Sequence, residues 1–255
     1  MEIQNLFNRT TIYNTLFWGL ITVSEYPNLE TFKQSNSTKY NQWVKFVSTK
    51  YGEDKVTDEN YLKYSQLYPE FSKLLSAAYA TIESNNGQIK RKFKIISEKE
   101  EYDTIAKFTD VLDYYYNVGH NTTPKFDYVM AGYDLTNYDI PTYLKKFMHY
   151  YNKDNVREIP MLIKFFLISK PWDANSINVK NLYKFNSNQQ ITDFDVMAKY
   201  INLKQPEGLI DDDNLSSYYW NNINTEPEET MKRINFKLTN TINTCIQFVN
   251  NFRYI

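Results

Sequence analysis

The chain has 255 residues, with 29 lysines and arginines against 30 aspartates and glutamates, so its formal net charge at pH 7 is −1. A balance this close to neutrality provides no overall basic field for binding nucleic acid. The single cysteine excludes a disulfide framework, and two histidines are too few for a histidine-based zinc site. No apolar run is long enough to span a bilayer and the N-terminus lacks a signal-peptide pattern, so we expect a soluble protein without membrane partners.

The first part of the chain predicts three strands. Residues 11–23 are apolar, β-branched and aromatic, which is typical of a buried strand. Residues 29–66 are polar and favour helix. Residues 74–83 predict a second strand, and the turn sequence at 85–87 leads into a third at 89–96. The second and third strands should therefore form a hairpin.

The rest of the chain predicts helices around further strands. Ser97 and the acidic residues after it are typical of a helix start, and this helix should continue to about residue 116. Residues 127–133 predict a fourth strand, and Pro141 the first turn of another helix, which runs to about residue 151. The later elements are expected at 160–169, 177–182, 193–201 and, as a long helix, 227–252. This order predicts one α/β domain over residues 1–255, with a mixed sheet flanked by helices.

Six short motifs follow one another along the chain. They are Tyr-Pro-Glu-Phe-Ser-Lys-Leu at 68–74, Ala-Gly-Tyr-Asp-Leu-Thr-Asn-Tyr-Asp-Ile-Pro at 131–141, Lys-Pro-Trp at 170–172, Leu-Tyr-Lys-Phe at 182–185 with Asp-Phe-Asp-Val-Met-Ala at 193–198, Ile-Asp-Asp at 210–212, and Tyr-Tyr-Trp at 218–220. In this order they resemble the 3′–5′ exonuclease domains of the DnaQ-like, ribonuclease H-like superfamily. More narrowly, the chain resembles stand-alone exonucleases related to the proofreading domain of family B DNA polymerases. The resemblance covers most of residues 12–250 and implies a ribonuclease H-like sheet of five strands.

The resemblance also implies where a catalytic centre would lie. Active members of the family hold two divalent cations with four carboxylates, and such cations require oxygen ligands. This chain has Gly19 and Ile21 at the first two acid positions and Leu238 at the last, whereas Asp139 keeps the acid of the second motif. A further family aspartate aligns with Asn178. One acid of four cannot confine two divalent ions, so we expect no metal, no cofactor and no catalytic residue.

Other residues at or near these motifs have simpler interpretations. Tyr133 and Asp134 replace the histidine and asparagine of the second motif, and Ile234 stands at the position of a tyrosine or histidine one turn before Leu238. Glu25 could supply an acid only through a change of strand register. We interpret Gly119-His120-Asn121 as a loop, Asp211-Asp212-Asp213-Asn214 as a helix start, Cys245 as a core residue, and Lys90-Arg91-Lys92 as a solvated strand end rather than a phosphate contact.

Composition bears on the kind of partner. Asparagine, lysine, isoleucine and tyrosine are abundant, as an AT-rich genome produces, and the 23 tyrosines could also provide contact surface for partners. We expect a non-catalytic, structural subunit of a bacteriophage virion, in the tail or in the portal–tail connector ring, made in the host cytoplasm. Its partners would be copies of itself and other virion proteins, contacted through the segment before Thr11 and the stretch 33–66.

Two alternatives stay open. The first is a pseudo-nuclease that binds nucleic acid, against which the near-neutral charge argues, because affinity for DNA depends largely on neutralised phosphates. The second is an active 3′–5′ exonuclease, which would need Glu25 in the site and a substitute for the acid missing at Leu238.

Overall fold

The computed structural model describes residues 12–85, 88–123, 125, 128–151, 156–168, 176–184, 194–200, 202–203 and 205–252. Several sequence predictions fall outside these residues. They concern the segment before Thr11, Asn86 and Gly87 of the hairpin turn, Lys170-Pro171-Trp172, Phe185 and Asp193.

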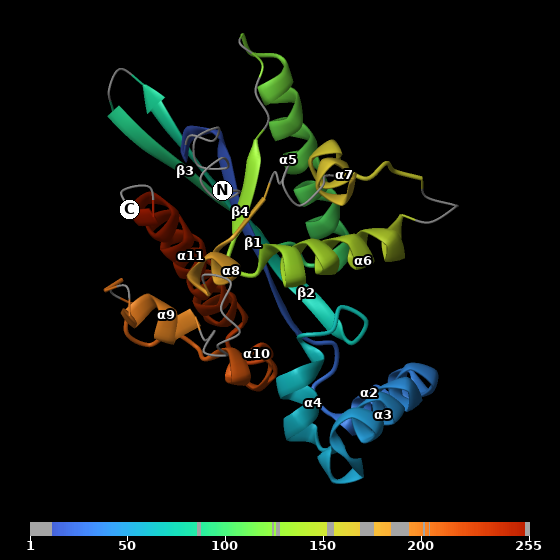
Figure 1. Ribbon diagram of the computed structural model, residues 1–255. Coiled ribbons are helices and arrows are strands. Elements are labelled where there is room, and N and C mark those ends of the chain that lie inside the picture. The colour runs from blue at the N-terminus through green and yellow to red at the C-terminus, as the bar shows by residue number, and fades with distance from the viewer. Residues whose placement is uncertain are drawn as a thin grey trace. The chain divides into compact units, whose positions relative to one another are not determined.

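Five strands form one mixed sheet (Figure 1). They are β1 (Thr15–Ser24), β2 (Ser72–Asn85), β3 (Gln88–Ile96), β4 (Val129–Gly132) and β5 (Ser176–Asn178), in the spatial order β3-β2-β1-β4-β5. β2 and β3 pair antiparallel with Asn85 opposite Gln88, which confirms the hairpin. β4 pairs in parallel with both β1 and β5. The predicted α/β fold, a ribonuclease H-like five-stranded mixed sheet flanked by helices, is confirmed.

The helices largely follow the predicted order. They are α2 (Leu29–Ser35), α3 (Ser37–Tyr51), α4 (Asp58–Ser65), α5 (Glu101–His120), α6 (Ile140–Tyr150), α7 (Met161–Ile168), α8 (Val179–Tyr183), α9 (Phe194–Tyr200), α10 (Leu215–Asn222) and α11 (Pro227–Phe252). The stretch 29–66, which favours helix, forms three α-helices, and Asn28, Asn36 and Thr57 each accept a hydrogen bond at a helix N-terminus. None of the helices in the described ranges is long and apolar enough to cross a membrane.

The chain divides into two compact units. One contains Met1–Leu20, Ala77–Glu207 and Leu238–Ile255, and the other contains Ile21–Ser76 and Gly208–Lys237. Three elements, β1, β2 and α11, run from one unit into the other. The single domain over residues 1–255 stays a prediction.

In the first unit, the centre of β1 is covered on both faces. Trp18 packs against Phe108 of α5, with ring centroids 5.1 Å apart, whereas the neighbouring Gly19 faces Leu238 of α11. Successive strand residues point to opposite faces of a sheet, so α5 and α11 cover opposite faces of β1 (Figure 1). This explains why β1 is buried along its length and mostly apolar, rather than alternating between buried and exposed residues.

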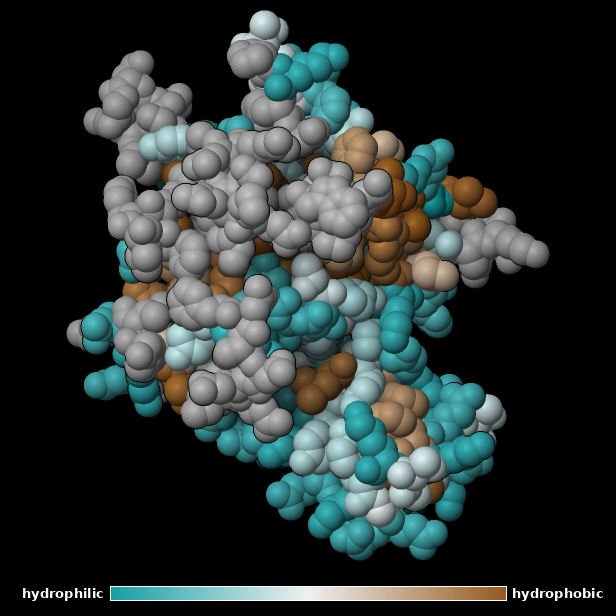
Figure 2. All heavy atoms as spheres, in the orientation of Figure 1, coloured by the Kyte–Doolittle hydropathy of each residue, from teal (hydrophilic) through white to brown (hydrophobic). Residues whose placement is uncertain are grey.

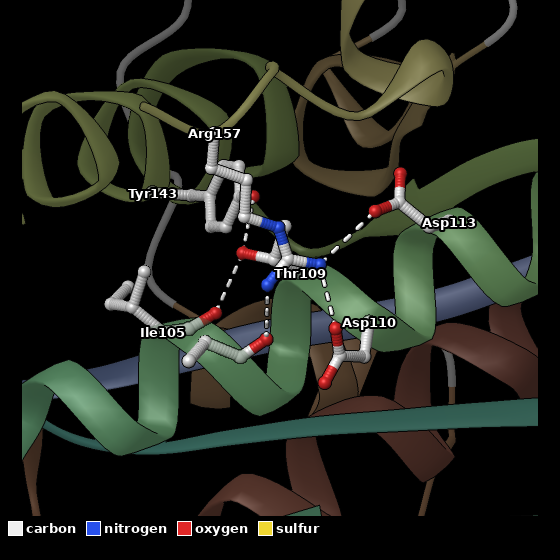
Figure 3. Close-up of polar contacts among 7 residues, drawn as sticks. Ile105, Thr109, Asp110, Asp113, Tyr143 and Arg157 are labelled. Carbon is white, nitrogen blue, oxygen red and sulfur yellow. Dashed lines mark hydrogen bonds and ion pairs between the residues drawn. The ribbon is translucent and has the colours of Figure 1, made fainter. Parts of the chain in front are cut away.

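Polar contacts fix α6 and the segment before α7 against α5 (Figure 3). The Thr109 hydroxyl donates to the Ile105 carbonyl oxygen at 2.7 Å and lies 2.9 Å from the buried hydroxyl of Tyr143 on α6. Arg157 contacts the carboxylates of Asp110 and Asp113 on α5 at 2.6 and 3.1 Å. These contacts position the start of α6, which directly follows Asp139.

The second unit has an aromatic core. Phe32 of α2, Trp43 and Val47 of α3 and Tyr61 of α4 are buried together. The Tyr61 ring lies 5.2 Å from that of Phe32 and 5.5 Å from that of Trp43. The stretch 33–66 therefore contributes Trp43, Val47 and Tyr61 to a core of this unit, and its role as a contact region stays a prediction.

Candidate functional site

The strand and turn that carry Asp139 are held unusually close to β1. A Cβ atom at Gly132, the last residue of β4, would lie 2.6 Å from the Trp18 carbonyl oxygen. Only glycine permits this approach of the two backbones. A π-helical turn, Leu135–Asp139, follows, and its amide at Asp139 donates to the Asp134 carbonyl oxygen at 3.3 Å. Such turns occur frequently at functional sites.

The Asp139 side chain is bound to the backbone of β1. Its Oδ1 atom accepts a hydrogen bond of 2.9 Å from the Leu20 amide, and only 5% of the residue is exposed. The carboxyl group therefore satisfies a buried backbone donor that would otherwise lack a partner. In this position it works as a structural acceptor between β1 and the turn that follows β4.

Three residues that the motifs assign to the centre come together. A Cβ atom at Gly19 would lie 3.9 Å from Asp139 Oδ1 and 3.5 Å from Leu238 Cδ1, which is ordinary van der Waals contact. Ile21 is two residues further along β1, and alternation places it on the same face of the strand as Gly19. Ile234 is buried one turn before Leu238 on α11. Apart from Asp139, none of these side chains offers an oxygen atom.

Asn178 is engaged in a different set of contacts. Its Oδ1 accepts from the Asn181 amide at 3.0 Å and so caps α8, while its Nδ2 donates to Thr136 Oγ1 at 2.7 Å and to Asp134 Oδ1 at 3.3 Å. Lys180 Nζ lies 2.6 Å from Asp134 Oδ2. Motif reasoning did not identify this network, although an asparagine just before a helix is itself a capping signal.

Burial controls the ionisation of the centre. The pKa of Asp139 rises to about 7, chiefly because its charged form is desolvated; the hydrogen bond from Leu20 opposes this shift and the charge of Asp134 adds to it. Burial, and secondarily the charge of Asp139, also raises the pKa of the Cys245 thiol on α11. Cys245 is 1% exposed, so it is an unreactive core residue, as the sequence suggested.

The side chains at the centre do not fit a pair of divalent cations. Hard cations need several oxygen ligands, and Gly19, Ile21 and Leu238 supply none. Within the ranges that the structure describes, no group of three or more His, Cys, Asp and Glu side chains could hold a metal ion. The expectation of a chain without metal or cofactor stays a prediction.

The other candidate residues have structural partners. Glu25 pairs with Lys39 of α3, and its amide donates to the Phe71 carbonyl oxygen. His120 is the last residue of α5, so the predicted loop at Gly119-His120-Asn121 is wrong for its first two residues, which complete the helix.

The acidic and basic runs are partly neutralised within the chain. Asp212 pairs with Lys237 and Asp213 with Lys63, and a short 3-10 helix, Asp212–Asn214, leads into α10. On β3, Lys92 pairs with Glu83 and Arg91 donates to Asn243. These contacts agree with a helix start and a solvated strand end.

Comparisons of this chain with protein-family models, with curated proteins and with solved structures found no match. The resemblance to exonucleases therefore stays a prediction based on the motifs.

Proposed function

We propose that this chain is a non-catalytic protein, related to 3′–5′ exonucleases, that works by contact with other proteins. The observation that carries the proposal is the convergence of Gly19, Asp139 and Leu238 at the centre of β1. Nucleases of this type hold two metal ions at such a place, and a glycine and a leucine cannot replace carboxylate ligands. The remaining acid is engaged by the Leu20 amide.

Exposed apolar side chains support a role in protein contact. Figure 2 shows apolar atoms gathered over the region of α7, whose residues Leu167 and Ile168 are 52% and 75% exposed. Met148 of α6 is 65% exposed. Exposed apolar patches on soluble proteins commonly mark interaction sites.

We further propose that the assembly is a bacteriophage particle, with this chain as a repeated subunit of its tail or portal–tail connector. The support is the composition typical of AT-rich genomes, the resemblance to a replication enzyme, and the near-neutral charge, which disfavours DNA binding. Mass spectrometry of purified particles should find the chain in stoichiometric amount. Particles that lack it would contradict this assignment.

The loss of catalysis has its own test. The purified chain should not degrade single-stranded DNA with magnesium or manganese. Degradation that disappears in an Asp139→Ala variant would overturn the proposal. DNA binding that weakens steeply with salt, without degradation, would favour a pseudo-nuclease that binds nucleic acid.

A matched gain-of-function variant tests the origin of the centre. The combined changes Gly19→Asp, Ile21→Glu and Leu238→Asp restore the carboxylates that the resemblance implies, and the contacts around Gly19 leave room for a Cβ atom. Manganese should bind to the triple variant and not to the wild-type chain, as measured by calorimetry. A folded triple variant that binds no manganese would contradict the assigned geometry.

A further inference from the structure

β3 is an edge strand whose outer side has no backbone partner among the described residues (Figure 1). The order of the sheet places it beside β2 alone. In the part of the chain that the structure describes, its backbone forms no hydrogen bond to an element other than β2. Every second residue of an edge strand directs its amide and carbonyl groups outward, which makes the edge a template for a further strand.

One face of β3 carries a lysine at every second residue. Lys90, Lys92 and Lys94 are exposed, and they share a face because side chains alternate along a strand. The register with β2 confirms this arrangement, since Lys90 stands opposite Glu83 and Lys94 opposite Tyr79. The positive charge of the strand is therefore concentrated in one row.

The acids nearest to this row are already neutralised. Glu83 pairs with Lys92 at 2.7 Å, and Glu98, just beyond the end of the strand, pairs with a lysine of α5 at 2.7 Å. Among the described residues, neither Lys90 nor Lys94 has a carboxylate within ion-pair distance. Two exposed ammonium groups on one face thus remain available to an acidic partner.

Tyrosines from β2 and α5 line the same face. The Tyr115 ring lies 5.7 Å from the ring of Tyr79, and its hydroxyl lies 3.4 Å from that of Thr81 on β2. Tyr114, the preceding residue of α5, is 61% exposed, with its ring centroid 5.2 Å from that of Tyr115. Tyrosine is enriched among the residues that anchor protein interfaces.

We propose that β3 binds an extended acidic segment of a partner protein, which adds a further strand at this edge of the sheet. The inference rests on the proposed role in protein contact, and it identifies a surface and the chemistry of the partner. Strand addition satisfies the outward backbone groups, and alternate side chains provide specificity. Acidic residues at every second position of the segment lie on the face of the three lysines, whereas the residues between them meet the face of the half-buried Phe93.

The same features disfavour two other occupants of the edge. Antiparallel or parallel pairing of β3 strands from two copies brings lysine rows together, and like charges opposite each other destabilise a sheet. A phosphate backbone accepts hydrogen bonds and donates none, so a nucleic acid matches only the amide half of the outward backbone groups. A peptide backbone matches both halves.

Binding of a designed peptide tests the proposal. The probe is a fluorescent peptide of nine residues, as long as β3, in which glutamates alternate with valines and threonines. Fluorescence anisotropy with wild-type chain up to about 1 mM, a concentration that detects weak specific contacts, should show saturable binding. A peptide of the same composition with its glutamates consecutive should bind at least about tenfold more weakly. A chain that binds neither peptide, or both equally, overturns the proposal.

Charge reversal locates the contact. Lys90→Glu combined with Lys94→Glu should weaken binding at least about tenfold, and this variant should instead bind a peptide with lysines in place of the glutamates. Lys45→Glu combined with Lys199→Glu makes the same change of charge outside β2, β3 and α5 and should leave binding unchanged. Circular dichroism must show that both variants keep the wild-type unfolding temperature to within a few degrees; if the reversal variant does not, Lys90→Gln combined with Lys94→Gln replaces it. Equal weakening by the two pairs of substitutions overturns the assigned surface.

N-methylation of the peptide separates strand addition from attraction between charges alone. In a paired edge strand, every second amide donates to the neighbouring strand and the amides between point away. Of two peptides, one N-methylated at its glutamates and the other at the residues between, only one should lose binding. Equal affinities of these two peptides overturn the proposal, as does tighter binding of a thymidine oligonucleotide than of the alternating peptide. The proposed function fails separately, if the chain degrades DNA or if purified particles lack it.

Discussion

Replacing Asp139 by asparagine should stabilise the protein at neutral and alkaline pH. Burial raises the pKa of this carboxyl group from the ordinary 3.8 to about 7, and the charge of Asp134 adds to that effect while the hydrogen bond from Leu20 opposes it. Between these values the folded protein keeps a proton that the unfolded chain releases. The stability that Asp139 provides is therefore complete below about pH 3.8 and is lost as the pH rises through about 7.

The size of the effect follows from the same values. The interval from 3.8 to about 7 corresponds to about 4 kcal/mol, at ~1.36 kcal/mol per pH unit. Relaxation and water penetration around a buried charge reduce this figure, so we expect a gain of about 1–4 kcal/mol for Asp139→Asn at pH 8. The asparagine carbonyl oxygen can still accept the Leu20 amide. The gain should grow from about pH 4 to pH 7 and then stay constant.

Urea unfolding of wild-type and Asp139→Asn chains at a series of pH values from 4 to 9 measures this difference, in which the titration of other groups cancels. Asp139→Ala is the matched control, because it removes the acceptor and leaves the Leu20 amide buried without a partner, at a cost of about 1–3 kcal/mol. It should be less stable than Asp139→Asn at every pH. A difference between wild type and Asp139→Asn that does not vary with pH would refute the reasoning.

Four further substitutions test the packing at and near the centre. Gly132→Ala should cost about 2–3 kcal/mol in urea unfolding, because its Cβ meets a backbone oxygen at 2.6 Å, whereas Gly19→Ala should change stability by less than about 1 kcal/mol; equal effects would contradict the geometry. Arg157→Met should cost only about 1 kcal/mol in thermal unfolding, since its ion pairs are partly exposed, and a loss of several kcal/mol would show that they are stronger. Asn178→Ala should cost about 1 kcal/mol through the lost cap of α8; an unchanged unfolding temperature would show that the cap contributes nothing.

The elements with a strong local pattern could be predicted from the sequence. β1 is a run of apolar and β-branched residues, and the β2–β3 hairpin has its turn residues between two strand-like segments. β1, β2 and β3 are neighbours in the sheet, and β4, which precedes the Asp139 turn, pairs with β1. The order of the motifs was therefore enough to expect Gly19 beside Asp139.

Short elements and long-range polar contacts could not be predicted in the same way. β5 has only three residues and continues directly into α8, so it has no periodicity to detect. Arg157 binds carboxylates on α5 that precede it by more than forty residues, and no local pattern encodes such a distance. The network of Asp134, Asn178 and Lys180 depends on the parallel pairing of β4 with β5, which the sequence does not state.

The Leu20 hydrogen bond separates the two roles that Asp139 could have. As a metal ligand it would be needed in its charged form, so Asp139→Asn would abolish activity. As a buried acceptor between β1 and the turn after β4, it needs only an oxygen atom, and its charge is a cost above about pH 7. We therefore expect that Asp139→Asn is more stable at pH 8 and self-associates as the wild-type chain does, when both are compared by sedimentation velocity. A stabilised variant that no longer associates would mean that the ionised carboxylate takes part in assembly.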